Sequence, residues 1–274
     1  MTGQNGTVGT PSDGKDAGAG GVPARCGPAI SAIGADGAPG GWATAWLEAP
    51  AGGGAPRTGL ALLPDAEALA ALRDAGGGTA AVGVDMPIGL PQTVGLRACD
   101  RAARARLGPR RSSVFAPPSR PLLAAGSYAE VRALVAVERE RRPEAQGLSA
   151  QAAGLLPRVR EIDTFARARA RSDGWLWESH PELCFARLNG GAPLGEPKRT
   201  AAGERQRRAL VTAAFPDAAQ RLDEAPWPRR SVAAHDLLDA YAVLATAERC
   251  ARGAQEELGD GARDACGLPM RIAV

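Results

Sequence analysis

The sequence contains few aromatic residues, no long hydrophobic run and no grouped cysteines. Aromatic side chains are 4% of the 274 residues, so Leu, Val, Ile and Ala must supply most of the core. No apolar run approaches the ~18 residues that a membrane-spanning helix needs, and we expect no membrane partner. Residues 1–21 lack the basic and apolar regions of a secretory signal. The five cysteines are scattered without a C-x-x-C spacing, which argues against a disulfide framework or a zinc knot and favours a cytoplasmic protein.

The charge of the chain is nearly balanced. It has 33 basic and 30 acidic residues and a net charge of +3, which does not by itself require a nucleic-acid partner. Lys15 and Lys198 are the only lysines, so almost all cations are arginines. Together with the many Ala, Gly and Pro residues, this indicates a compositional bias, and the abundance of arginine is weak evidence of function.

Short apolar segments and Gly-rich turns predict the order of the elements. Residues 1–27 have almost no large apolar side chain, and we expect a disordered tail followed by one domain over residues 28–274. An antiparallel meander of three strands is expected first, then two further strands and a last edge strand, over residues 29–36, 42–49, 58–63, 80–85, 175–178 and 268–274. Helical patterns cover residues 66–73, 96–107, 128–141, 150–171, 181–188, 203–215 and 231–251. This order predicts an α/β fold with a mixed β-sheet, helices on both faces, and a mainly helical insertion at about residues 86–174.

Acidic residues recur where the expected strands end. Asp36 ends the first strand, Asp85 the fourth and Glu178 the fifth, and Asp236 and Asp239 share one face of the last helix. Ligand sites of α/β sheets lie at the carboxyl ends of strands. If the first and fourth strands are adjacent and parallel, Asp36 and Asp85 meet at one edge, and the last helix can complete the cluster.

A cluster of carboxylates needs a cation to offset its repulsion. Oxygen-only ligands suit Mg²⁺ or Mn²⁺ better than Zn²⁺, and two such ions ~3.5–4 Å apart promote phosphodiester hydrolysis. The pattern therefore predicts Asp36, Asp85 and Asp239 as metal ligands, with Glu178 and Asp236 as accessory catalytic groups. Each acid also has an ordinary structural interpretation, as a turn residue, a strand-end or helix cap, or an arginine partner.

Other polar residues suit the same chemistry without establishing it. His180, before Pro181, is a candidate general acid or base, or merely a helix cap, and His235 could orient Asp236. Neither a phosphate-binding P-loop nor a G-x-S-x-G nucleophile motif is present. Residues 97–113 are rich in cations that could contact phosphate or form a solvated helix face, and the candidates are Arg101, Arg104, Arg110, Arg111, Ser112 and Ser113.

Several strings of the sequence, taken together and in order, resemble one family. They are Gly34-x-Asp36-Gly37, V-D-M-P-I-G-L-P at 84–91, C-D-R at 99–101, S-S-V-F at 112–115, R-E-I-D at 160–163, E-S-H-P-E at 178–182 and His235-Asp236 with Asp239-Ala240. From about Ile33 to the C-terminus, the chain resembles the domain of unknown function 429 family.

The resemblance implies a nuclease of the RNase H-like fold with a metal site. By motif it places Asp36 on the first strand, Asp85 on the fourth, and Asp236 and Asp239 on the last helix. The leading hypothesis is hydrolysis of nucleic acid with Mg²⁺ or Mn²⁺, and nucleic acid is the expected partner. The alternatives are a catalytically inactive binding module on the same scaffold and a small-molecule phosphotransferase, for which we find neither duplicated lobes nor phosphate loops.

Overall fold

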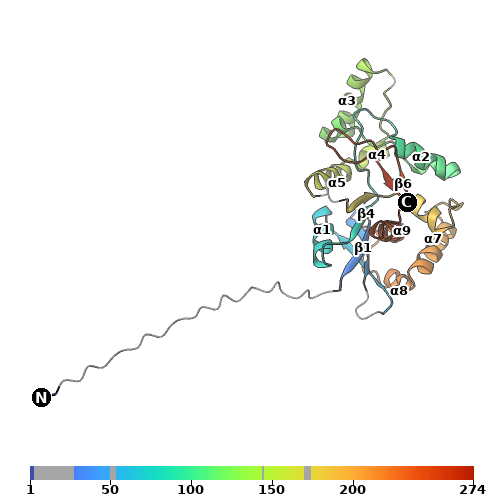
Figure 1. Ribbon diagram of the computed structural model, residues 1–274. Helices are drawn as coiled ribbons and strands as arrows, with labels where there is room; N and C mark the ends of the chain where they lie inside the picture. Colours follow the sequence, from blue (N-terminus) through green and yellow to red (C-terminus); the bar gives the residue numbers. More distant parts are fainter. Residues whose placement is uncertain (3–27, 50–53, 144, 170–173) are drawn as a thin grey trace.

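A five-stranded sheet forms the centre of the computed structural model (Figure 1), which describes residues 1–2, 28–49, 54–143, 145–169 and 174–274. The disordered tail expected over residues 1–27 lies outside the described residues except at positions 1 and 2. The strands are β1 (Ile30–Ala38), β2 (Gly41–Glu48), β3 (Arg57–Leu63), β4 (Ala81–Val84) and β5 (Leu176–Glu178). Their order in the sheet is β3-β2-β1-β4-β5.

The sheet is mixed, and its parallel part brings two strand ends together. β1 pairs with β2 and β2 with β3 in antiparallel fashion, which confirms the meander. β4 runs parallel to β1, with Ala35 opposite Val84, and β5 runs parallel to β4. Asp36 and Asp85 are the next residues after the paired Ala35 and Val84. They therefore lie at the same edge of the sheet, on neighbouring strands.

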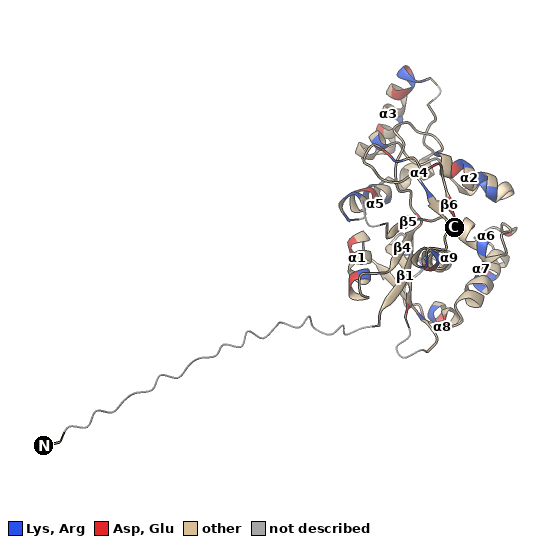
Figure 2. Ribbon diagram, viewed as in Figure 1, with Lys and Arg blue, Asp and Glu red and all other residues tan. Residues whose placement is uncertain are grey.

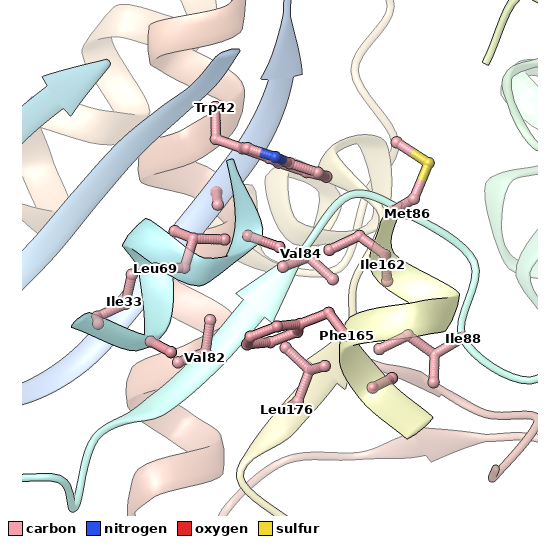
Figure 3. Packing of buried hydrophobic residues seen from close by; sticks show 14 of the residues in the cluster. Ile33, Trp42, Leu69, Val82, Val84, Met86, Ile88, Ile162, Phe165 and Leu176 are labelled. Atoms are coloured by element: carbon pink, nitrogen blue, oxygen red, sulfur yellow. The ribbon is translucent and has the colours of Figure 1, made fainter. Parts of the chain in front are cut away.

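One face of the sheet is covered by α1 (Ala66–Ala75) and α5 (Leu156–Arg169). Side chains from β1 and β4 point into this layer, where Ile33, Val82 and Val84 pack with Leu69 and Phe165 (Figure 3). The buried aliphatic residues of this layer match the composition, which has few aromatics to offer.

The other face is covered by α9 (Ala234–Ala251), with α6 (Pro181–Leu188), α7 (Ala201–Ala214) and α8 (Ala218–Asp223) around it. Gly34 on β1 lets this helix approach closely, because a Cβ atom there would lie 2.1 Å from the backbone nitrogen of Leu244 and 2.4 Å from the carbonyl oxygen of Ala240. The absence of a side chain at Gly34 thus sets how near α9, with its acids, comes to the end of β1.

Replacing Gly34 with Ala is expected to lower the free energy of unfolding by about 1–3 kcal/mol, because the added methyl group must displace helix backbone. Gly37→Ala is the matched control, since a Cβ atom there meets only the Met86 methyl carbon, at 3.7 Å. Urea unfolding of both variants measures the difference. Equal stabilities would contradict this account of the contact between β1 and α9.

The segment between β4 and β5 is mostly helical and stands at the end of the sheet where β1 and β4 finish (Figure 1). It contains α2 (Ala98–Leu107), the 3₁₀ helices η2 (Gly108–Ser113) and η3 (Arg120–Ala124), α3 (Tyr128–Arg141), α4 (Ala150–Gly154) and α5. The expected edge strand at 268–274 is mostly irregular. Within it β7 (Ile272–Ala273) pairs with β6 (Glu257–Leu258) in a separate two-stranded sheet. Ala273 reaches the main sheet through a parallel bridge to Ser179 and by packing against Ala81 and Trp177. None of the described helices is both long enough and apolar enough to cross a membrane.

Candidate active site

A cavity of about 880 Å³ opens where β1 and β4 end. Its walls come from these strand ends, η2, the start of α6, the loop before α7 and the first turns of α9. Both histidines of the chain, His180 and His235, lie on it, as does Lys198. All six candidate catalytic residues line this one cavity: Asp36, Asp85, Glu178, His180, Asp236 and Asp239.

Of the acids that line the cavity, Asp36 and Asp85 have no partner in the part of the chain that the structure describes. Among the described residues, no side chain or backbone group forms a hydrogen bond or an ion pair with either carboxylate. Asp36 is only 6% exposed. Burial raises the pKa of Asp36 well above its ordinary value, and the negative charges of Asp85 and Asp239 raise it further. The protein therefore holds Asp36 beside a second carboxylate in a position that favours a cation.

Asp239 has a cationic partner. The Lys198 ammonium group donates a hydrogen bond of 2.8 Å to its Oδ2 atom, and the Asp239 side chain is 1% exposed. Burial raises the pKa of Asp239 to about 6, although Lys198 acts in the opposite direction. The negative charges of Asp36, Asp85 and Asp239 together raise the pKa of Lys198.

Asp236 occupies the first turn of α9 and has a local role. Its Oδ2 atom accepts a hydrogen bond of 2.8 Å from the backbone N–H of Ala233, one residue before the helix. Its Oδ1 atom lies 3.3 Å from Nε2 of His235, whose pKa burial lowers. Asp236 thus caps α9, which corresponds to the capping interpretation, while its side chain still lines the cavity.

Glu178 is engaged by the buried Arg97. The guanidinium donates bonds of 2.5 and 2.8 Å to its two carboxylate oxygens and 2.8 Å to Oδ1 of Asp100. Glu178 also accepts from the backbone N–H of Ile88 at 2.7 Å, while Arg97 donates to the carbonyl oxygens of Ile88 and Gly89. This network holds the turn over residues 86–91, which directly follows Asp85. Glu178 therefore positions one wall of the site. Its predicted accessory catalytic role stays a prediction.

The N-terminus of α6 brings a further acid into the cavity. Oε1 of Glu182 accepts from Arg207 at 2.7 Å and from Arg110 at 3.3 Å, while its buried Oε2 atom has no hydrogen-bond partner among the residues that the structure describes. His180 donates from Nε2 to the carbonyl oxygen of Ser113 at 3.1 Å, because a carbonyl can only accept, and its Nδ1 atom is buried and unpartnered. A proton-transfer role for His180 stays a prediction.

The candidate phosphate contacts are divided by the structure. Arg110 and Ser113 line the cavity, whereas Arg101, Arg104, Arg111 and Ser112 do not. Arg101 donates to the carbonyl oxygen of Leu96 on its own helix, and Arg111 is exposed. Figure 2 shows arginine or lysine positions along both α2 and α7.

Three residues of the cavity region were not among the candidates from sequence: Lys198, Glu182 and Arg207. Lys198 had a signal, because it is one of two lysines in a chain that otherwise uses arginine. Glu182 lies within a string that carries the family resemblance. No sequence signal pointed to Arg207. Its side chain is fully buried and paired with Glu182 only through the tertiary packing.

The sequence profile of one protein family, described as protein of unknown function (DUF429), matches residues 34–263. The chain belongs to the DUF429 family. The match begins within β1 and ends after β6, so every residue that lines the cavity lies inside the DUF429 region except Ile272. Searches of curated proteins and of solved structures gave no match.

The metal ligands expected from sequence do not form a closed cage in this DUF429 member. In the part of the chain that the structure describes, no group of three or more His, Cys, Asp or Glu side chains is arranged to hold a metal ion. The donor types nevertheless fit Mg²⁺ or Mn²⁺, which are commonly held by one or two carboxylates, several waters and substrate phosphate oxygens. Asp36 and Asp85, both without protein partners, meet that lower requirement.

Proposed function

We propose that the protein is a divalent-metal-dependent phosphodiesterase of RNase H-like architecture that acts on nucleic acid. The observation that carries this proposal is the pair Asp36 and Asp85, two unpartnered carboxylates at the ends of adjacent parallel strands, beneath the acids of α9. The arrangement of an antiparallel meander followed by two parallel strands, with one helix across β1, supports the architecture.

Asp36 and Asp85 would hold the ion, Mg²⁺ or Mn²⁺. When bound, such an ion supplies an activated water and offsets negative charge on a phosphate oxygen. The prediction that Asp239 is a further ligand, and that two ions bind, stays a prediction, because Lys198 already contacts this carboxylate.

The cations of the cavity would orient the phosphate group. Lys198, Arg199 and Arg110 line the same space as Asp36 and Asp85, and Arg199 has an exposed side chain without an ion-pair partner among the described residues. Phosphate oxygens are good acceptors for such groups, which also reduce the repulsion between the carboxylates and a phosphodiester.

The experiment is an incubation of the full chain with labelled single-stranded DNA, duplex DNA and single-stranded RNA, with Mn²⁺, Mg²⁺ or EDTA. We expect cleavage of at least one of these with Mn²⁺, its loss in EDTA, and its recovery when excess Mn²⁺ is restored. Mn²⁺ binding by calorimetry without cleavage of any substrate would contradict the catalytic part of the proposal.

An inactive binding module is the second candidate, and one observation favours it. Lys198 already places a positive charge against Asp239, so the acid cluster is partly neutralised without metal. If the module has no metal function, wild-type protein should show no heat of Mn²⁺ binding and no thermal stabilisation by Mn²⁺.

A further inference from the structure

Lys198 faces the acid cluster as a fixed positive charge. Its Nζ atom lies 2.8 Å from Oδ2 of Asp239, and its charge opposes the rise in the pKa of Asp36 that burial and the neighbouring acids cause. Its side chain is 38% exposed, so it reaches the cluster from the open side of the cavity. A single cation therefore interacts with acids of β1 and α9 and with Asp85 after β4.

The loop that carries Lys198 is tied to the start of α7. Thr200 accepts from the backbone N–H of Gly203 at 3.0 Å and donates to the carbonyl oxygen of Pro197 at 2.9 Å. A Cβ atom on Gly203 would lie 2.0 Å from that carbonyl oxygen, so loop and helix are in close contact. Arg207 donates to the carbonyl oxygen of Glu196 at 3.1 Å, which fixes the loop from below.

The residue type at this position is also informative. The chain uses arginine for nearly all its cations, including the next position, Arg199, but has lysine at 198. An ammonium group is a compact point charge, whereas a guanidinium is a wide planar fork. Among positively charged side chains, lysine therefore resembles a metal ion most closely in a narrow space between carboxylates.

We infer that Lys198 is the resident cation of this cluster and that its ammonium group takes, at Asp239, the place that a second divalent ion would need. Divalent metal then binds as one ion, at Asp36 and Asp85, and Lys198 competes with any ion at Asp239. The assignment of the one ion rests on the proposed function. It replaces the two-ion arrangement expected from the sequence with one metal ion and one fixed ammonium group.

Calorimetric titration of the full chain with Mn²⁺ tests this inference. The test variant is Lys198→Gln. The matched control is Arg199→Gln, which removes one positive charge at the next residue and leaves the ion pair between Lys198 and Asp239 in place. We expect one ion per wild-type chain. Lys198→Gln should bind a second ion or bind Mn²⁺ at least about tenfold more tightly, because a unit charge about 4 Å away acts strongly at intermediate dielectric. Arg199→Gln should change affinity by less than about threefold, because exposed charges are screened.

The outcomes separate this inference from the proposed function. Two ions in the wild type, or equal titrations for the two variants, would overturn the role of Lys198 and leave a metal-dependent activity standing. Binding by Lys198→Gln but not by the wild type would support the role of Lys198 and contradict the proposed function. No binding by either protein would overturn both.

A second variant keeps the test decisive if Lys198→Gln does not fold. Asp239→Asn preserves the shape of the side chain and removes the partner of Lys198. With Asp239 outside the metal site, the variant should still bind one Mn²⁺ ion, at most about tenfold more weakly than the wild type, because one negative charge near the ion is lost. Loss of Mn²⁺ binding in Asp239→Asn would show that Asp239 is a ligand and would overturn the inference.

Discussion

Replacing Arg97 with Met should lower the free energy of unfolding by about 3–5 kcal/mol, the largest stability effect expected in this protein. The Arg97 side chain is 2% exposed and pairs with two acids that are themselves buried, Asp100 and Glu178. Methionine fills similar volume but removes the positive charge and the guanidinium donors of both carboxylates, which keep their backbone donors, and it leaves the carbonyl oxygens of Ile88 and Gly89 without the guanidinium donor. Urea unfolding at neutral pH measures the loss.

Two controls separate the buried network from a general effect of losing an arginine. Arg169→Met removes an ion pair with Glu67 whose side chains are 52% and 59% exposed, and should cost at most about 1 kcal/mol. Burial already raises the pKa of Glu178 to about 7 against the opposing charge of Arg97. A second change, Glu178→Gln on the Arg97→Met background, should therefore recover part of the loss at pH 8, because glutamine has no carboxylate that must stay charged in a buried site or take up a proton on folding. Equal losses for Arg97→Met and Arg169→Met would contradict the structural role of this network.

The sheet was predictable from the sequence because its signals are local. The apolar segments ending in Asp36 and Asp85 are short, continuous and bounded by Gly or Pro, and each became a strand near the expected bounds. The parallel pairing of β1 and β4, conditional in the sequence, follows from the intervening β2, β3 and α1. The expected strand at the C-terminus was harder to predict, since only Ile272 and Ala273 find a partner strand.

The candidate site was predictable by residue type but not by partner. Strand-end position drew attention to Glu178 and Asp36 alike, yet only Glu178 meets a buried arginine, Arg97, which precedes α2 and lies 81 residues earlier in the sequence. Glu161, in another string of the family resemblance, accepts from the Trp42 indole at 2.9 Å and the Ala66 N–H at 2.7 Å, and so joins layers of the fold. Which acids serve the fold and which stay free depends on long-range packing, which single-sequence patterns do not encode.

The variant Asp36→Asn should combine a large loss of activity with a gain in stability of the metal-free protein. If Asp36 and Asp85 hold the ion, removal of one ligand charge should lower Mn²⁺-dependent cleavage by on the order of 10³-fold, since a metal supplies several kcal/mol to the transition state. In EDTA, the same change relieves repulsion with Asp85 and Asp239 and should raise the free energy of unfolding by about 1 kcal/mol at pH 8.

The pH dependence of this gain gives its sign independently. A carboxyl group whose pKa is raised on folding contributes stability below its unfolded pKa, near 4, and that contribution is lost as the pH rises through the folded pKa. Wild-type protein in EDTA should therefore lose stability relative to Asp36→Asn as the pH increases from about 4. Asp239, with a folded pKa of about 6, should make the free energy of unfolding of both proteins fall with pH by a similar amount. Asp74→Asn, which removes a carboxylate that is 63% exposed and outside the cavity, should show neither effect. Full activity in Asp36→Asn would remove Asp36 from the metal site, and a less stable variant in EDTA would mean that this carboxylate is held by favourable contacts rather than strained by its neighbours.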